Sequence, residues 1–168
     1  MAAKTYGQLL NLAAGRKRTV SIERKQWEKA IEDQKRSTVI VVDITFDILL
    51  AEIIERTFPR RTKDVQKLVN GINMIQKARL AYILGLIDKM VLGDLEQMHE
   101  IRNKFGHSFE ASFTHTKVLK FVRELSTAKG QEVTEKNSYK FYKSAGIKCV
   151  DHITAIIDEQ ELKKAQKG

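Results

Sequence analysis

Residues 37–58 read STVIVVDITFDILLAEIIERTF, and the fold class of the chain depends on whether this stretch is a strand or a helix. The β-branched residues at its start favour a strand by propensity. The apolar pattern nevertheless continues through the whole stretch without a turn signal, which is too long for a single strand. Its apolar residues recur at helical steps of three and four: Val39, Val42, Phe46, Leu49 and Ile53. We therefore predict a buried helix that ends before Pro59, because a residue that precedes proline is disfavoured in the helical region.

The rest of the chain has the same helical periodicity. Predicted helices cover residues 5–14, a segment opening at Ser21 as its N-cap, residues 73–87, residues 92–105, a segment starting at Thr114 or Thr116, and residues 138–163. Residues 60–72 and 126–137 are predicted to be polar connections. The predicted fold class is therefore all-α, and for 168 residues the simplest such architecture is a helical bundle.

Positive charge is concentrated at the start of the chain. The net charge is +9, and residues 1–36 hold nine Lys or Arg against four Asp or Glu. We predict a basic N-terminal helical arm over residues 1–36, a helical-bundle domain over residues 37–163 and a tail over residues 164–168. A basic surplus favours polyanionic partners, meaning nucleic acid or anionic lipid.

The centre of this charge is Arg16, Lys17 and Arg18, which follow Gly15 in a predicted loop. One interpretation is a contact to the phosphates of RNA or DNA, which would be salt-sensitive and independent of base sequence. The other is a solvated loop that only aids solubility, since short basic runs are common on protein surfaces. The residue types do not distinguish the two.

Cysteine usage and apolar content bear on the compartment. The single cysteine, Cys149, excludes an internal disulfide and fits a reducing environment. No segment approaches the roughly 20 apolar residues of a membrane span, and no signal-peptide pattern follows Met1. We therefore expect a cytoplasmic protein without a membrane partner. Cys149 lies on an apolar stripe, so we expect it in the core and not as a nucleophile.

The residues with the clearest chemical potential are Arg102, Asn103 and His107, within the run EIRNKFGHS at residues 100–108. Asn103 and His107 are four residues apart and share a helix face, with Arg102 next to them. A histidine can move protons at neutral pH, and an arginine can stabilise charge on phosphate oxygens. Together with an orienting asparagine, these groups suit metal-independent cleavage of an RNA backbone by its own 2′-hydroxyl.

A structural interpretation of the same residues remains open. In it, Asn103 bonds the ring of His107, and Arg102 pairs with a carboxylate such as Asp43 or Asp47. No metal site is predicted, because the second ligand position of a His-Glu-x-x-His helix starting at His99 holds asparagine. No phosphate-cradling glycine loop is present either, so we expect no cofactor.

Three stretches resemble the mannitol operon repressor family: ARLAYILGLI at residues 78–87, Asp94-Leu95, and IRNKFGHS at residues 101–108. The resemblance covers about residues 37–125. Gly106 stands where the family usually has alanine, a departure that leaves the polar residues in place. The resemblance implies an all-α homodimer that controls gene expression through nucleic acid or a protein partner.

The same stretch is similar to the Arg-x4-His signature of HEPN domains, and Arg102, Asn103 and His107 match it. In active members that signature implies a metal-independent ribonuclease site formed where two copies meet; other members are inactive binding partners. The function expected first is a mannitol-repressor-type regulator. The alternatives are a HEPN-type endoribonuclease, acting as a toxin or defence effector, and a non-catalytic interaction scaffold.

Overall fold

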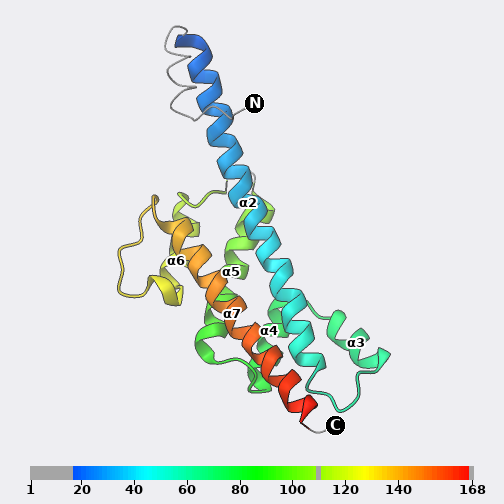
Figure 1. Cartoon of the computed structure of the whole chain (residues 1–168). Coiled ribbons are helices and arrows are strands. Elements are labelled where there is room, and N and C mark those ends of the chain that lie inside the picture. Colours follow the sequence, from blue (N-terminus) through cyan, green and yellow to red (C-terminus); the bar gives the residue numbers. More distant parts are fainter. Residues whose placement is uncertain (1–16, 109–110, 167–168) are drawn as a thin grey trace. The chain divides into compact units, whose positions relative to one another are not determined.

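The computed structural model describes residues 17–108 and 111–166 (Figure 1). These residues form six α-helices and a short 3₁₀ helix, with no strand among them. The elements are α2 (Lys17–Glu55), α3 (Lys63–Asn70), α4 (Met74–Ile83), α5 (Lys89–His107), α6 (Thr116–Glu124), η1 (Ser126–Ala128) and α7 (Ser138–Ala165). The all-α fold class is thereby confirmed. Within this described part of the chain, every helix is too short or too polar to span a bilayer.

The chain divides into two compact units, residues 1–37 and residues 38–168. In the first unit, the described part of α2 runs from Lys17, so the predicted N-cap at Ser21 is wrong and lies inside a helix. Lys17 and Arg18 are in the first turn of α2 and not in a loop. The predicted helix over residues 5–14 lies outside the described residues.

In the second unit, the ambiguous stretch is a helix. The residues from Thr38 to Glu55 complete α2, which ends before Pro59 as predicted. The side chains of Val39, Phe46 and Ile53 are fully buried, so one face of the helix contributes to the core. Helical periodicity therefore outweighs the β propensity of the individual residues, because burial of a continuous stripe stabilises more than propensity costs.

The predicted polar connection over residues 60–72 is wrong, because it contains α3. Thr62 is the N-cap of this helix, and its hydroxyl accepts a hydrogen bond from the Val65 amide at 3.3 Å. Val65, Leu68 and Val69 follow helical spacing, but the helix has only eight residues and only Val69 is buried, so its apolar pattern is too short to stand out from its polar neighbours.

Capping residues set the ends of α4 and α5. Asn73 and Gln76 form a capping box at the start of α4, as the predicted start implies. The helix ends at Ile83, four residues earlier than predicted, because Gly85 takes a positive φ of 70°. Asp88 then caps α5, accepting from the Val91 amide at 2.8 Å, so α5 begins three residues before the predicted Leu92 and extends to His107.

The last two helices follow the prediction closely. α6 begins at Thr116, one of the two predicted starts, and α7 begins at Ser138. The predicted loop over residues 126–137 contains η1, whose first amide, that of Ser126, donates to the buried carboxylate of Asp94 at 2.6 Å. α7 continues to Ala165, two residues beyond the predicted end, so the helix includes the start of the predicted tail.

The core of the second unit is organised around α5, which packs against α4, α6 and α7. Polar contacts join the second-unit part of α2 to the same core: Lys77 Nζ lies 2.6 Å from Asp47 Oδ1, and the Tyr139 hydroxyl donates to Thr38 Oγ1 at 3.1 Å. Gly146 allows α7 a close approach, since a Cβ there would lie 3.2 Å from Met98 Cε of α5. This packing fixes the rotation of α5 and hence which of its side chains face solvent.

Candidate functional site at the end of α5

The last two turns of α5 carry the predicted site residues. Ile101 and Phe105 are buried in the core, which turns the helix so that Arg102 and Asn103 are partly exposed. His107 is exposed in the final turn. The buried stripe therefore positions the polar residues, because neighbouring positions on a helix differ by about 100°.

Arg102 is held by a carboxylate from α2. Its Nε lies 3.5 Å from Asp43 Oδ2, and its Nη1 donates to Asn103 Oδ1 at 3.5 Å. The structural interpretation correctly expected a pairing with Asp43; the other carboxylate it named, Asp47, is engaged by Lys77 instead. Both contacts of Arg102 are long, and 40% of its side chain is exposed. The guanidinium therefore keeps donors available for a ligand.

The hydrogen bond that the structural interpretation expects between Asn103 and His107 is not formed in the described residues. There the Asn103 oxygen accepts from Arg102, and His107 makes no hydrogen bond or ion pair with any described side chain. The imidazole of His107 is thus not used to brace the fold in this part of the chain. It can present either ring nitrogen to a ligand.

Gly106 lies beside the arginine. A Cβ added there would meet Arg102 Nη1 at 3.5 Å, which is an ordinary van der Waals distance. The guanidinium therefore reaches along α5 toward the final turn, where His107 is located. An alanine would also fit, so glycine at this position is not required by space.

His99 and Asp43 belong to the same group of side chains, although no role was predicted for His99. His99 Nδ1 lies 3.3 Å from Asp43 Oδ1, so one carboxylate contacts both His99 and Arg102. His99 and Asn103 are four residues apart and therefore share one helix face. This spacing indicates that His99 belongs to the cluster. Nothing local indicates Asp43 as the partner, because 56 positions separate it from His99.

The other predicted residues are not brought to this cluster by anything that the structure describes. Arg16 lies outside the described residues, and Lys17 and Arg18 belong to the first unit. No group of three or more His, Cys, Asp or Glu in the described chain could hold a metal ion. The candidate site therefore consists of the arginine, asparagine and histidine side chains at the end of α5.

Cys149 is a core residue, as predicted. Its side chain is fully buried, and burial, together with the nearby charge of Asp94, raises the pKa of its thiol to about 12. A thiol with so high a pKa carries almost no thiolate at neutral pH. Cys149 is therefore not a nucleophile in the folded protein.

Comparison of the chain with protein families, with curated proteins and with solved structures finds no match. The described residues define an all-α protein with a cluster of a partly exposed arginine and asparagine and an exposed histidine at the end of α5. The function must therefore be inferred from that cluster and from the charge of the chain.

Proposed function

We propose that the chain is a regulator of the mannitol-repressor type that binds nucleic acid, with the end of α5 as a phosphate-binding site. The observation that carries this proposal is the state of Arg102: Asp43 and Asn103 orient its guanidinium at 3.5 Å, yet 40% of the side chain remains exposed. An oriented and accessible arginine is well suited to phosphate oxygens, because its donors match their geometry. The net charge of +9 favours the same class of ligand.

A second candidate function is metal-independent cleavage of RNA by a HEPN-like site. The observation that favours it is His107, an exposed imidazole without a hydrogen-bond partner among the described residues. In this function His107 acts as general acid or base on the 2′-hydroxyl or the leaving oxygen. Arg102 stabilises the charge that develops on the phosphate, and Asn103 orients the reacting groups.

The proposal includes a homodimer, which the resemblance to both families implies. Exposed apolar side chains on the second-unit part of α2 support this proposal: Val41 is 59%, Ile44 54% and Ile48 62% exposed. They follow one another at steps of three and four, so they share one helix face. An apolar stripe of this kind is stabilised when a partner surface covers it.

The test uses the full chain with labelled single-stranded RNA in EDTA. Anisotropy measures binding over a range of salt concentrations, and a gel measures cleavage. Arg102→Gln is compared with Arg60→Gln, which removes the same charge at an exposed position before α3. We expect Arg102→Gln to weaken binding by about tenfold, the effect of one charge-assisted hydrogen bond, and Arg60→Gln to change it much less.

His107→Ala separates the two candidate functions. Binding of RNA without cleavage supports the regulator, whereas cleavage that the His107→Ala variant loses establishes the ribonuclease. If the wild-type chain neither binds nor cleaves nucleic acid, both proposals are wrong. The interaction scaffold then remains, and Arg102→Gln is expected to affect thermal stability alone, through its contacts with Asp43 and Asn103.

A further inference from the structure

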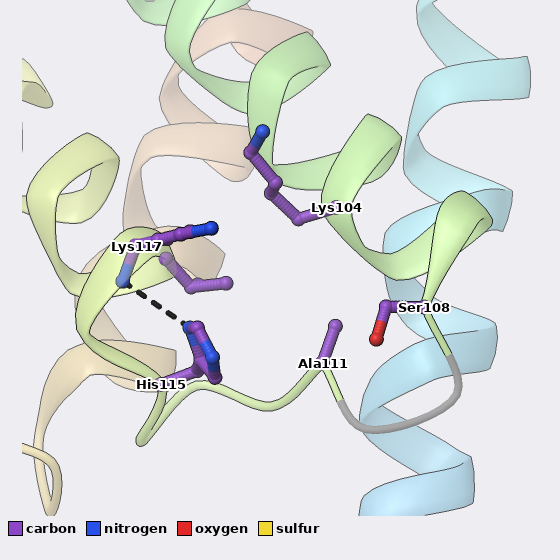
Figure 2. Close-up of a pocket in the computed structure, with 6 residues that line it drawn as sticks. Lys104, Ser108, Ala111, His115 and Lys117 are labelled. Atoms are coloured by element: carbon purple, nitrogen blue, oxygen red, sulfur yellow. Dashed lines mark hydrogen bonds between the residues drawn. The ribbon is translucent and has the colours of Figure 1, made fainter.

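A small cavity lies beside the last turn of α5, where the chain leaves this helix and enters α6. Its volume is about 160 Å³. Figure 2 shows the residues that line it: Lys104 on α5, His115 and Lys117 at the start of α6, and Ser108 and Ala111 between the two helices. The lining residues are Lys104, Ser108, Ala111, His115, Lys117 and Val118.

The polar side chains that line the cavity can all donate hydrogen bonds. His115 caps α6, and its Nδ1 accepts from the Lys117 amide at 3.3 Å (Figure 2). A neutral imidazole that accepts at Nδ1 carries its proton on Nε2, so this second nitrogen is a donor. Lys104 and Lys117 add two ammonium groups and Ser108 adds a hydroxyl. None of the described residues that line the cavity is acidic, so their charges and donors favour an anion.

The cavity also has the size for a polyatomic anion. A single water needs about 10–15 Å³ of such volume, so the cavity has room for several waters or for one tetrahedral anion. Ala111 and Val118 form an apolar part of the wall. The ammonium group of Lys104 lies over an aromatic ring next to the cavity, with its Nζ 5.9 Å from the centre of the Phe121 ring. This contact limits the motion of one of the two ammonium groups.

We propose that this cavity binds a phosphate group and that the phosphate belongs to the nucleic acid strand that contacts the end of α5. The identity of the ligand as nucleic acid rests on the proposed function, while the preference for phosphate rests on the cavity alone. Lys104 is three residues before His107, a spacing that puts the two Cβ atoms about 5–6 Å apart, and Ser108 directly follows His107. A strand with one phosphate at Arg102 then has a neighbouring phosphate in the cavity.

The first experiment titrates the isotope-labelled full chain with inorganic phosphate and follows amide shifts by NMR. We expect saturable shifts at Ser108 and Lys117 that are lost in the double variant Lys104→Gln/Lys117→Gln. Lys129→Gln is the control, since Lys129 is exposed and does not line the cavity. The proposal is wrong if phosphate causes no saturable shifts in the wild-type chain. It is also wrong if the same shifts persist in the double variant.

The second experiment measures binding of single-stranded RNA to the same variants as a function of salt. Loss of one phosphate contact lowers the slope of log K against log salt by about 0.7 for a single strand. We expect that change with Lys117→Gln and not with Lys129→Gln. Equal slopes for the two variants overturn the assignment of a strand phosphate to the cavity.

The two experiments also separate the cavity from the proposed function. A wild-type chain that binds inorganic phosphate through Lys104 and Lys117 but binds no RNA retains the phosphate site and loses the nucleic-acid function. A chain that binds RNA through Arg102, with no effect of Lys117→Gln, retains the function and loses the assignment of a strand phosphate to the cavity.

Discussion

At the scale of single residues, the central group is the carboxylate of Asp43. It lies 3.3 Å from His99 Nδ1 and 3.5 Å from Arg102 Nε. It therefore orients Arg102 and also competes with any anion for the same guanidinium. The balance of these two effects can be measured by removing the charge of Asp43 while keeping its shape.

The variant Asp43→Asn is expected to lower the free energy of unfolding by about 1 kcal/mol, because partly exposed pairs at long distance contribute little. RNA affinity is expected to stay constant or to increase, because a competing negative charge is gone. Arg102→Gln should instead weaken binding. Chemical denaturation and anisotropy provide the two measurements, and equal losses of affinity in both variants would mean that Arg102 only braces α2 against α5.

The thiol of Cys149 gives a prediction about reactivity. Burial, and then the charge of Asp94, raises its pKa to about 12, so the folded protein presents very little thiolate at pH 8. A thiol reagent is expected to leave the native chain unmodified and to react stoichiometrically once denaturant unfolds it. Absorbance of the released chromophore measures both rates. Rapid reaction of the native chain would show that Cys149 is accessible, contrary to its burial.

At the scale of elements, the end of α2 is fixed by a network of charged side chains. Glu52 contacts Arg56, which directly follows the helix, and Arg61 beyond Pro59, with Glu52 Oε2 2.6 Å from Arg61 Nη2. Arg56 also reaches Glu161 of α7 at 2.8 Å. Burial by itself would raise the pKa of Glu52, but the hydrogen bonds and charges of Arg56 and Arg61 outweigh it and lower the pKa below 4.5.

This lowered pKa predicts how stability depends on pH. A carboxylate with a lowered pKa in the folded state contributes stability above its unfolded pKa and loses it as pH falls through the folded value. Glu52→Gln is therefore expected to lower the free energy of unfolding by about 1 kcal/mol at pH 7. Denaturation at several pH values should show the difference shrinking from about pH 4.5 downward. A difference that is the same at pH 7 and pH 3 would contradict the network.

At the scale of the whole molecule, the proposed dimer is the prediction with the largest consequence. Light scattering at micromolar concentration is expected to give the mass of two 19.3 kDa chains. Ile44→Lys is expected to give a folded monomer, because it puts a charge in the exposed apolar stripe of α2. Circular dichroism checks that the variant keeps its helices. A wild-type monomer would remove the dimer and any site composed of two chains.

Local sequence patterns were sufficient for most of the helices. Spacings of three and four identified the helical character of residues 37–58 despite their β-branched side chains, and they placed Cys149 in the core. The starts of α4, α6 and α7 agree with the prediction because they depend on residues within one turn of each start. The α-helical fold class follows from these short-range signals, since helical hydrogen bonds link residues only four positions apart.

Longer-range features required the packed structure. Sequence patterns did not identify α3, because its apolar residues Val65, Leu68 and Val69 span little more than one turn between polar residues. They also did not place Ser21 inside a continuous helix. Sequence patterns identified Arg102, Asn103 and His107 as candidate site residues. They did not identify His99 as a partner of Asp43. They also did not show that Lys104 and Lys117 line one cavity. Those contacts join different helices, and they depend on how far each helix is rotated and how closely it approaches its neighbour. That geometry is set by core packing across the whole second unit, and no short stretch of the chain contains it.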